Sequence, residues 1–111
     1  MGTRAEQIAA RQRELSAQLD DFERQLADLR RLRESLHDDD EHDPDGVSLS
    51  SEWSRLEGLR AVTVDQLAAI RDAAAREERG EGTTCSSCGG PIAAARLAAR
   101  PDATECIDCA R

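Results

Sequence analysis

Apolar residues in the first third of the chain recur every three or four positions, with polar residues between them. The opening segment Thr3-Arg4-Ala5-Glu6 has the Ser/Thr-x-x-Glu form of a capping box, which begins a helix. The apolar positions after it are Ile8, Leu15, Leu19, Phe22, Leu26, Leu29 and Leu36. Their period is that of a seam that packs against another helix. The pattern predicts a helix over residues 3 to about 37, with Gln12 and Arg33 interrupting its seam.

A second apolar stripe follows with similar spacing. It is expected to end near Arg79, because Gly80 and Gly82 come next and glycine commonly ends helices. Gly58 and residues 61–64 lower helix propensity, by up to about 1 kcal/mol for the glycine, so a bend or local irregularity is expected there. The members of the stripe are Leu49, Trp53, Leu56, Thr63, Leu67, Ile70 and Ala74, broadened by Leu59 and Val62.

The segment between the two stripes is typical of a chain reversal. Asp43-Pro44-Asp45-Gly46 combines a proline, which fixes φ, with a permissive glycine. The two helices should therefore lie antiparallel within one chain, because closing a short loop costs little compared with associating two chains. A homodimeric coiled coil has the same periodicity and stays open as an alternative, although we expect a monomer.

The composition favours an extended helical hairpin over a compact globule. Charged residues make up 34% of the 111 residues, and Phe22 and Trp53 are the only aromatic residues. A chain of this length holds one domain, or one small domain with an extended helical element. No apolar run approaches the roughly 20 residues that span a bilayer, and the N-terminus lacks the apolar stretch of a signal peptide. We therefore expect a cytoplasmic protein with no membrane partner.

The net charge of −8 is concentrated at the predicted reversal, where six of the 23 acidic residues lie within positions 38–45. The 15 arginines outside it face the remaining 17 acids, so no segment has the basic footprint that direct, sequence-specific DNA binding requires. The simplest interpretation of residues 38–48 is a solvated acidic loop. At the end of a hairpin they would instead form a narrow anionic tip, suited to a positively charged channel that contains magnesium.

The same stretch imitates a calcium-binding EF-hand loop. The match is Glu41-x-Asp43-x-Asp45-Gly46-x5-Glu52, with glycine at position six and glutamate at position twelve. Glutamate replaces the usual first aspartate, Pro44 stiffens the loop and no second hand is present. Calcium binding is therefore the weaker interpretation.

Four cysteines form two Cys-x2-Cys pairs, which is a strong signal for zinc. Cys85 and Cys88 are separated from Cys106 and Cys109 by the 17 residues 89–105, enough to bring four thiolates around one tetrahedral ion. A reducing cytosol favours metal ligation over disulfides. Four thiolates leave no open position for water, so the predicted zinc is structural; a redox switch that releases zinc on oxidation is the alternative.

These patterns together predict an all-α protein with two parts. Residues 1–80 would form a long antiparallel coiled-coil hairpin with an acidic tip at 38–48. Residues 81–111 would form a small C-terminal zinc finger with four cysteine ligands, and its few core residues would be Ile92, Leu97, Ile107 and several alanines. Such a small core depends on metal binding to fold.

The finger resembles that of the DksA/TraR family. The resemblance rests on Cys85-Ser86-Ser87-Cys88-Gly89-Gly90-Pro91-Ile92, the segment from Arg96 to Thr104, and Cys106-Ile107-Asp108-Cys109. The preceding helix, Asp-Pro tip and second helix extend the likeness over nearly the whole chain. It implies a regulator, not an enzyme, that binds bacterial RNA polymerase and inserts the coiled coil through the secondary channel.

Two departures bear on what the resemblance implies. The family's tip has two aspartates three residues apart; the nearest counterparts here, Asp43 and Asp45, are two apart, and counting back from Cys85 favours Asp45 as the principal tip residue. The helix that usually follows the finger, and the N-terminal material of longer members, have no counterpart in the sequence. Because such regions contact the alarmone ppGpp, we do not extend ppGpp binding to this chain.

We therefore predict a transcription regulator in which Cys85, Cys88, Cys106 and Cys109 hold zinc and Asp45, helped by Asp43, acts at the tip. The alternative is a zinc-stabilised coiled coil that serves as an interaction module for a protein other than RNA polymerase. A DNA-binding zinc finger ranks third, because the arginines of the finger are matched by nearby acids.

Overall fold

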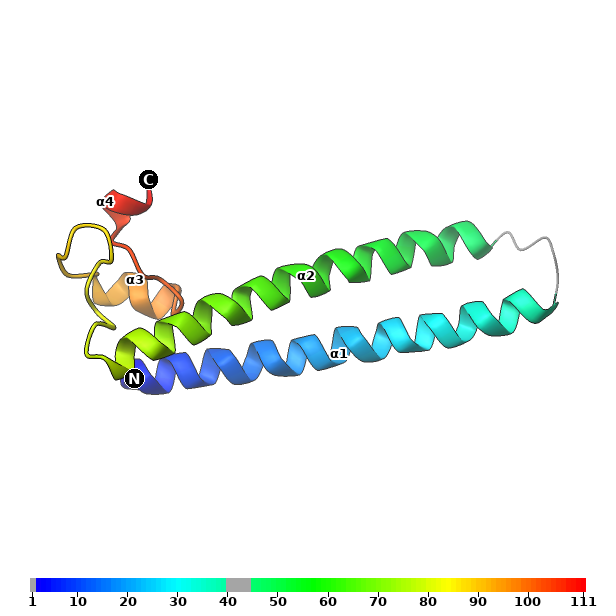
Figure 1. Ribbon diagram of the computed structural model, residues 1–111, viewed down its shortest axis with the longest axis horizontal. Coiled ribbons are helices and arrows are strands. Elements are labelled where there is room, and N and C mark those ends of the chain that lie inside the picture. Colours follow the sequence, from blue (N-terminus) through cyan, green and yellow to red (C-terminus); the bar gives the residue numbers. More distant parts are fainter. Residues whose placement is uncertain (1, 40–44) are drawn as a thin grey trace. The chain divides into compact units, whose positions relative to one another are not determined.

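The computed structural model describes the backbone of residues 2–39 and 45–111, and the side chains of 2–36 and 48–111. These residues form four helices: α1 (Arg4–Asp39), α2 (Asp45–Glu78), α3 (Ala94–Ala99) and α4 (Ile107–Ala110) (Figure 1). In the described part of the chain the only extended pairing is an isolated bridge between Thr84 and Pro91. The predicted all-α class, with two long helices and a small C-terminal region, is confirmed.

Helix α1 begins as the capping-box pattern predicts. The backbone N–H of Glu6 donates to Oγ1 of Thr3 at 3.1 Å, and the N–H of Gln7 donates to the Thr3 carbonyl at 2.9 Å. These bonds satisfy backbone donors that the first turn of a helix leaves without intrahelical partners. The helix then continues to Asp39, two residues beyond its predicted end.

Helix α2 runs without interruption from Asp45 to Glu78, so the irregularity expected at its middle is not found. Beyond its chain neighbours and the adjacent backbone of α2, no described atom lies within 4 Å of the position that a Cβ on Gly58 would take, so this glycine carries only its propensity cost. Leu56 lies just before this region and Thr63 within it, at 1% and 0% exposure. Burying such side chains contributes more than the roughly 1 kcal/mol that one helical glycine costs.

A glycine cap ends α2 where the sequence predicted. Gly80 has φ 78°, a left-handed conformation that favours glycine. Its N–H donates to the Glu77 carbonyl at 3.0 Å, and the N–H of Glu81 donates to the Arg76 carbonyl at 2.8 Å. This pair of bonds is the Schellman motif, which satisfies the last carbonyls of a helix.

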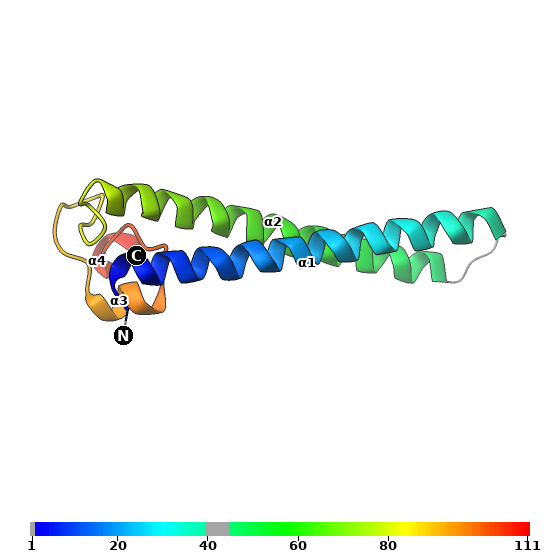
Figure 2. The ribbon, with the colours of Figure 1, turned by 90° about the horizontal axis from the view of Figure 1, so that it is seen from below.

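The chain divides into two compact units, which are described separately: Met1–Leu15 with Asp65–Arg111, and Ser16–Val64. In each unit a segment of α1 and a segment of α2 lie side by side (Figures 1 and 2). Within the Ser16–Val64 unit the pairing is antiparallel, because Gln18 contacts Thr63 whereas Glu23, further along α1, contacts the earlier residue Arg60. The predicted pairing within one chain is confirmed.

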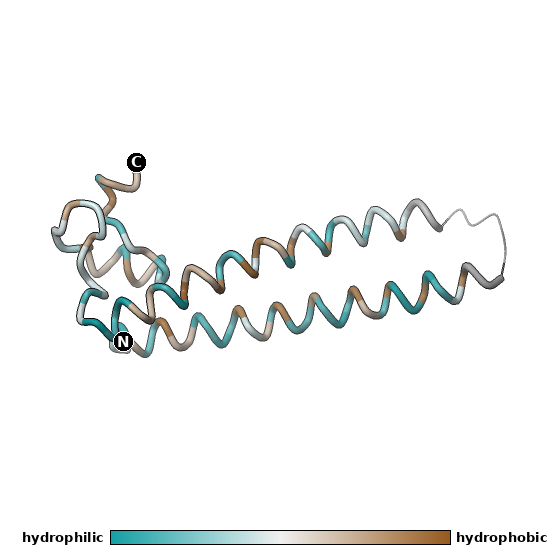
Figure 3. Tube along the Cα trace, viewed as in Figure 1, coloured by the Kyte–Doolittle hydropathy of each residue, from teal (hydrophilic) through white to brown (hydrophobic). Residues whose placement is uncertain are grey.

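The apolar seams are largely as predicted. Apolar and polar positions alternate along both helices (Figure 3). The predicted seam residues with described side chains are buried or half-buried, but Leu59 and Val62 are 38% and 54% exposed, so the prediction that they broaden the seam is wrong. A helix with a single helical partner buries only a narrow stripe, and these two side chains fall outside it. No helix in the described ranges is long and apolar enough to cross a membrane.

Candidate metal centre

The first cysteine pair lies on a tight turn that directly follows the end of α2. The N–H of Cys85 donates to the Gly90 carbonyl at 2.7 Å, and the N–H of Gly89 donates to the Cys85 carbonyl at 3.0 Å. Gly89 has φ 76°, which explains why the turn needs glycine there. These bonds curl the backbone around Cys85 and Cys88, so that both side chains face the same point.

The second pair is brought to the first by bonds across the finger. The N–H of Ser86 donates to the Thr104 carbonyl at 2.8 Å, and the Ser87 hydroxyl donates to the Glu105 carboxylate at 2.7 Å. From α3, Nε of Arg96 donates to the Glu105 carbonyl at 2.9 Å. The backbone just before Cys106 is thereby fixed against the first turn.

The four thiols converge on one point. The sulfurs of Cys85, Cys88, Cys106 and Cys109 all lie within 4.8 Å of one another. The Sγ atoms of Cys88 and Cys106 are 3.8 Å apart. Four sulfurs bound to zinc at about 2.3 Å in a tetrahedron are about 3.8 Å from one another. The donor set and its spacing therefore fit a tetrahedral zinc ion.

A comparison with protein families matches residues 74–111 to the prokaryotic DksA/TraR C4-type zinc finger. This chain carries a C4 zinc finger of the DksA/TraR family. The cofactor of such a finger is a structural zinc ion, in agreement with the clustered cysteines. A comparison with curated protein sequences gave no match.

A solved structure extends the likeness beyond the DksA/TraR-type finger. The chain is similar to the transcription factor DksA2 from Pseudomonas aeruginosa, with 25% sequence identity and a TM-score of 0.80. The similarity covers 96% of this chain and 77% of that chain. The fold of nearly the whole chain is thus similar to that of a transcription factor.

The thiols of the DksA/TraR-type finger do not ionise independently. Hydrogen bonds from the backbone of Cys106, and then of Cys88, lower the pKa of Cys85 to about 6. Hydrogen bonding with the side chain of Cys106, and then with those of Cys85 and Cys88, raises the pKa of Cys109 far above that of a free thiol. Sulfurs this close repel one another once ionised, so four thiolates require a cation between them. A divalent metal supplies that charge.

The small core of the finger is formed beside the sulfurs. Cys85, Ile92, Leu97 and Ala103 are buried together, and Cys106 and Cys109 pack against them. Ile107 is 56% exposed, so the prediction that it belongs to this core is wrong. It lies in the one-turn helix α4 between two cysteines that face the core, and its side chain therefore points to the other side.

The predicted tip residues fall where the structure gives no side-chain description. Asp43 lies outside the described residues, and Asp45 is described only as the first backbone position of α2. Most of the EF-hand-like pattern lies there as well. Its last residue, Glu52, is described and accepts two hydrogen bonds from Arg55, at 2.6 and 3.0 Å. Hydrogen bonding with Arg55 lowers the pKa of Glu52.

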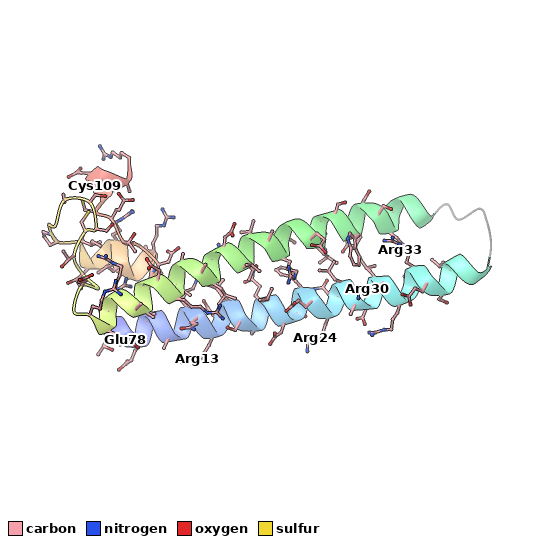
Figure 4. All side chains as sticks on the ribbon, viewed as in Figure 1. Arg13, Arg24, Arg30, Arg33, Glu78 and Cys109 are labelled. Carbon is pink, nitrogen blue, oxygen red and sulfur yellow. The ribbon has the colours of Figure 1, made fainter. Side chains whose placement is uncertain are left out.

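Sequence reasoning missed an arginine–tryptophan contact between the helices of the Ser16–Val64 unit. The guanidinium carbons of Arg30 and Arg33 lie 5.8 and 5.9 Å from the centre of the Trp53 ring. Figure 4 labels both arginines on α1. The sequence held one signal for this contact, the interruption of the seam at Arg33. An arginine at a seam position needs a partner on the facing helix that accommodates a cation, and an aromatic ring does so.

Proposed function

We propose that the chain is a transcription regulator that binds bacterial RNA polymerase and inserts its acidic coiled-coil tip through the secondary channel to modulate initiation. The observation that carries the proposal is the similarity to the transcription factor DksA2 over 96% of the chain, combined with a DksA/TraR-type finger. The regulator would act in the cytoplasm as a monomer, without direct sequence-specific DNA binding.

In this proposal Cys85, Cys88, Cys106 and Cys109 hold the zinc. Bound zinc supplies a cross-link that keeps the finger folded around its few apolar residues. With four protein ligands the ion has no open position for water or substrate. The chain would therefore act by occupying its partner and not as an enzyme.

The tip would act through charge, with Asp45 as the principal residue and Asp43 assisting. An anionic projection is drawn towards a positively charged channel, where low-dielectric walls focus the field. A carboxylate that reaches a catalytic magnesium ion competes for its oxygen ligands or perturbs them. Two long helices suit this role, because each helical residue adds about 1.5 Å of reach.

The proposal separates binding from activity, and one substitution tests this. The Asp45→Asn variant should bind core polymerase within about twofold of the wild type, because steering by one of six acids is a small part of the charge. It should lose the effect of the wild type on initiation in a reconstituted transcription assay. The matched control is Asp65→Asn, at an exposed position within α2, which should keep both properties.

A regulatory effect of Asp45→Asn equal to that of the wild type would remove Asp45 from this role. A pull-down from lysate that recovers no polymerase subunit would contradict the polymerase proposal as a whole. The zinc-stabilised interaction module acting on another protein would then become the better explanation.

A further inference from the structure

The first residue of α1 forms hydrogen bonds with the finger near the other end of the sequence. Nε of Arg4 donates to the Gly82 carbonyl at 3.3 Å, and Nη2 donates to the Ala103 carbonyl at 3.5 Å. We infer that Arg4 is a positioning residue that couples zinc binding in the finger to the docking of the α1 N-terminal segment, residues 4–15, on α2. This inference goes beyond polymerase binding and rests only on the proposed cysteine ligands.

The surroundings of Arg4 make its position depend on these two acceptors. Its Nη1 atom is buried and has no hydrogen-bond partner among the described residues. Burial lowers the pKa of Arg4, and the charges of Glu77 and Asp102 offset part of that effect. A partly buried guanidinium is favourable only while its acceptors and counter-charges stay in place. Movement of the finger would therefore leave Arg4 poorly compensated.

Both acceptors belong to backbone that the metal centre organises. Ala103 is one of the buried residues packed with Cys85, and Cys106 and Cys109 lie against the same cluster. Gly82 is buried three positions before Cys85. A core of this size does not fold without its metal, so the Gly82 and Ala103 carbonyls are correctly placed only when zinc is bound.

An arginine from α2, Arg76, also bonds to the backbone of residues 81–84, the segment that contains Gly82. Nη2 of Arg76 donates to the Thr84 carbonyl at 2.6 Å and to the Glu81 carbonyl at 3.2 Å. Arg76 joins the finger to the helix that directly precedes it, whereas Arg4 reaches across 78 and 99 positions of sequence. Of these two arginines, only Arg4 links the finger to α1.

Coupling of this kind is reciprocal. If zinc strengthens the docking of residues 4–15 by some factor, the docking contact of Arg4 must strengthen zinc binding by the same factor. Arg4 donates two hydrogen bonds, and both are long. We expect them to strengthen docking, and therefore zinc binding, roughly tenfold. An arginine that stabilised only α1 would leave the zinc affinity unchanged when it is replaced.

The test combines hydrogen–deuterium exchange with zinc affinity, using the full chain. Removing zinc from the wild type with a chelator should increase exchange in residues 4–15 about tenfold, in addition to exposing the finger. In Arg4→Gln those residues should exchange rapidly even with zinc bound, and zinc affinity should fall by the same factor. Arg13→Gln is the control, because Arg13 is an exposed residue of the same helix (Figure 4).

Three results would overturn the inference. The first is zinc removal that leaves exchange in residues 4–15 of the wild type unchanged. The second is an Arg4→Gln variant that keeps the full zinc-dependent change. The third applies if Arg4→Gln does not fold, and it uses Arg4→Lys, which retains the charge but not the forked donors. In that variant, a zinc-dependent exchange of residues 4–15 equal to that of the wild type would overturn the inference. A chain that binds no zinc would contradict the cysteine assignment itself, which distinguishes the two failures.

Discussion

Replacing Trp53 with leucine should destabilise the Ser16–Val64 unit by removing its contacts with two arginines. Trp53 is half-buried, and the guanidinium carbons of Arg30 and Arg33 are 5.8 and 5.9 Å from its ring centre. A cation–π contact at a partly exposed site contributes about 0.5–1 kcal/mol, so the two together amount to about 1–2 kcal/mol. Leucine keeps an apolar residue in the seam, although the smaller side chain also buries less area.

Urea unfolding of the zinc-loaded protein, followed by far-ultraviolet circular dichroism, measures this loss without depending on tryptophan fluorescence. A double-mutant cycle with Trp53→Leu and the pair Arg30→Gln and Arg33→Gln isolates the coupling from the change in buried area. The expected coupling is about 1–2 kcal/mol. A coupling below about 0.3 kcal/mol, which is within the usual error of additivity, would refute the reasoning.

Two further pairs of substitutions test the packing. Leu56→Ala should lower the free energy of unfolding by about 2–5 kcal/mol, whereas Leu59→Ala should change it by less than about 0.5 kcal/mol, because the two side chains are 1% and 38% exposed. Equal losses of unfolding free energy in the two variants would contradict the assignment of Leu56, and not Leu59, to the buried seam. Gly58→Ala should stabilise α2 by about 0.5–1 kcal/mol, since its Cβ would meet nothing within 4 Å. Gly82→Ala should cost about 1–3 kcal/mol, because its Cβ would lie 3.1 Å from the Cα of Glu77; thermal unfolding that shows no difference between the two glycine variants would contradict this.

Patterns that repeat locally were predictable from the sequence. Seam periodicity located both long helices, and glycine after Arg79 located the end of α2. Cys-x2-Cys spacing predicted the cluster of four thiols, because ligand geometry restricts that spacing. The errors occurred where burial depends on the partner: Val62 continues an apolar run but has no helix to cover it.

Contacts between distant segments were not predictable. Nothing near Arg4 in the sequence indicates that its acceptors lie 78 and 99 positions away, because surface arginines have the same helix propensity. The start of α2 shows a similar limit. Asp45 and Gly46 suit a turn by composition, yet both lie in the first turn of α2.

A polar pair at the seam, Gln18 and Thr63, explains why one alignment of the helices in the Ser16–Val64 unit is favoured. Thr63 is fully buried; its hydroxyl donates to the Leu59 carbonyl at 2.9 Å and accepts from Nε2 of Gln18 at 3.2 Å. Arg33, in the seam of α1, meets the ring of Trp53. Sliding one helix by a heptad would separate Gln18 from Thr63 and place Gln18 opposite Leu56 or Ile70, whose side chains are buried. The hydrogen bond between Gln18 and Thr63 therefore favours one register of a seam that leucines would otherwise leave ambiguous.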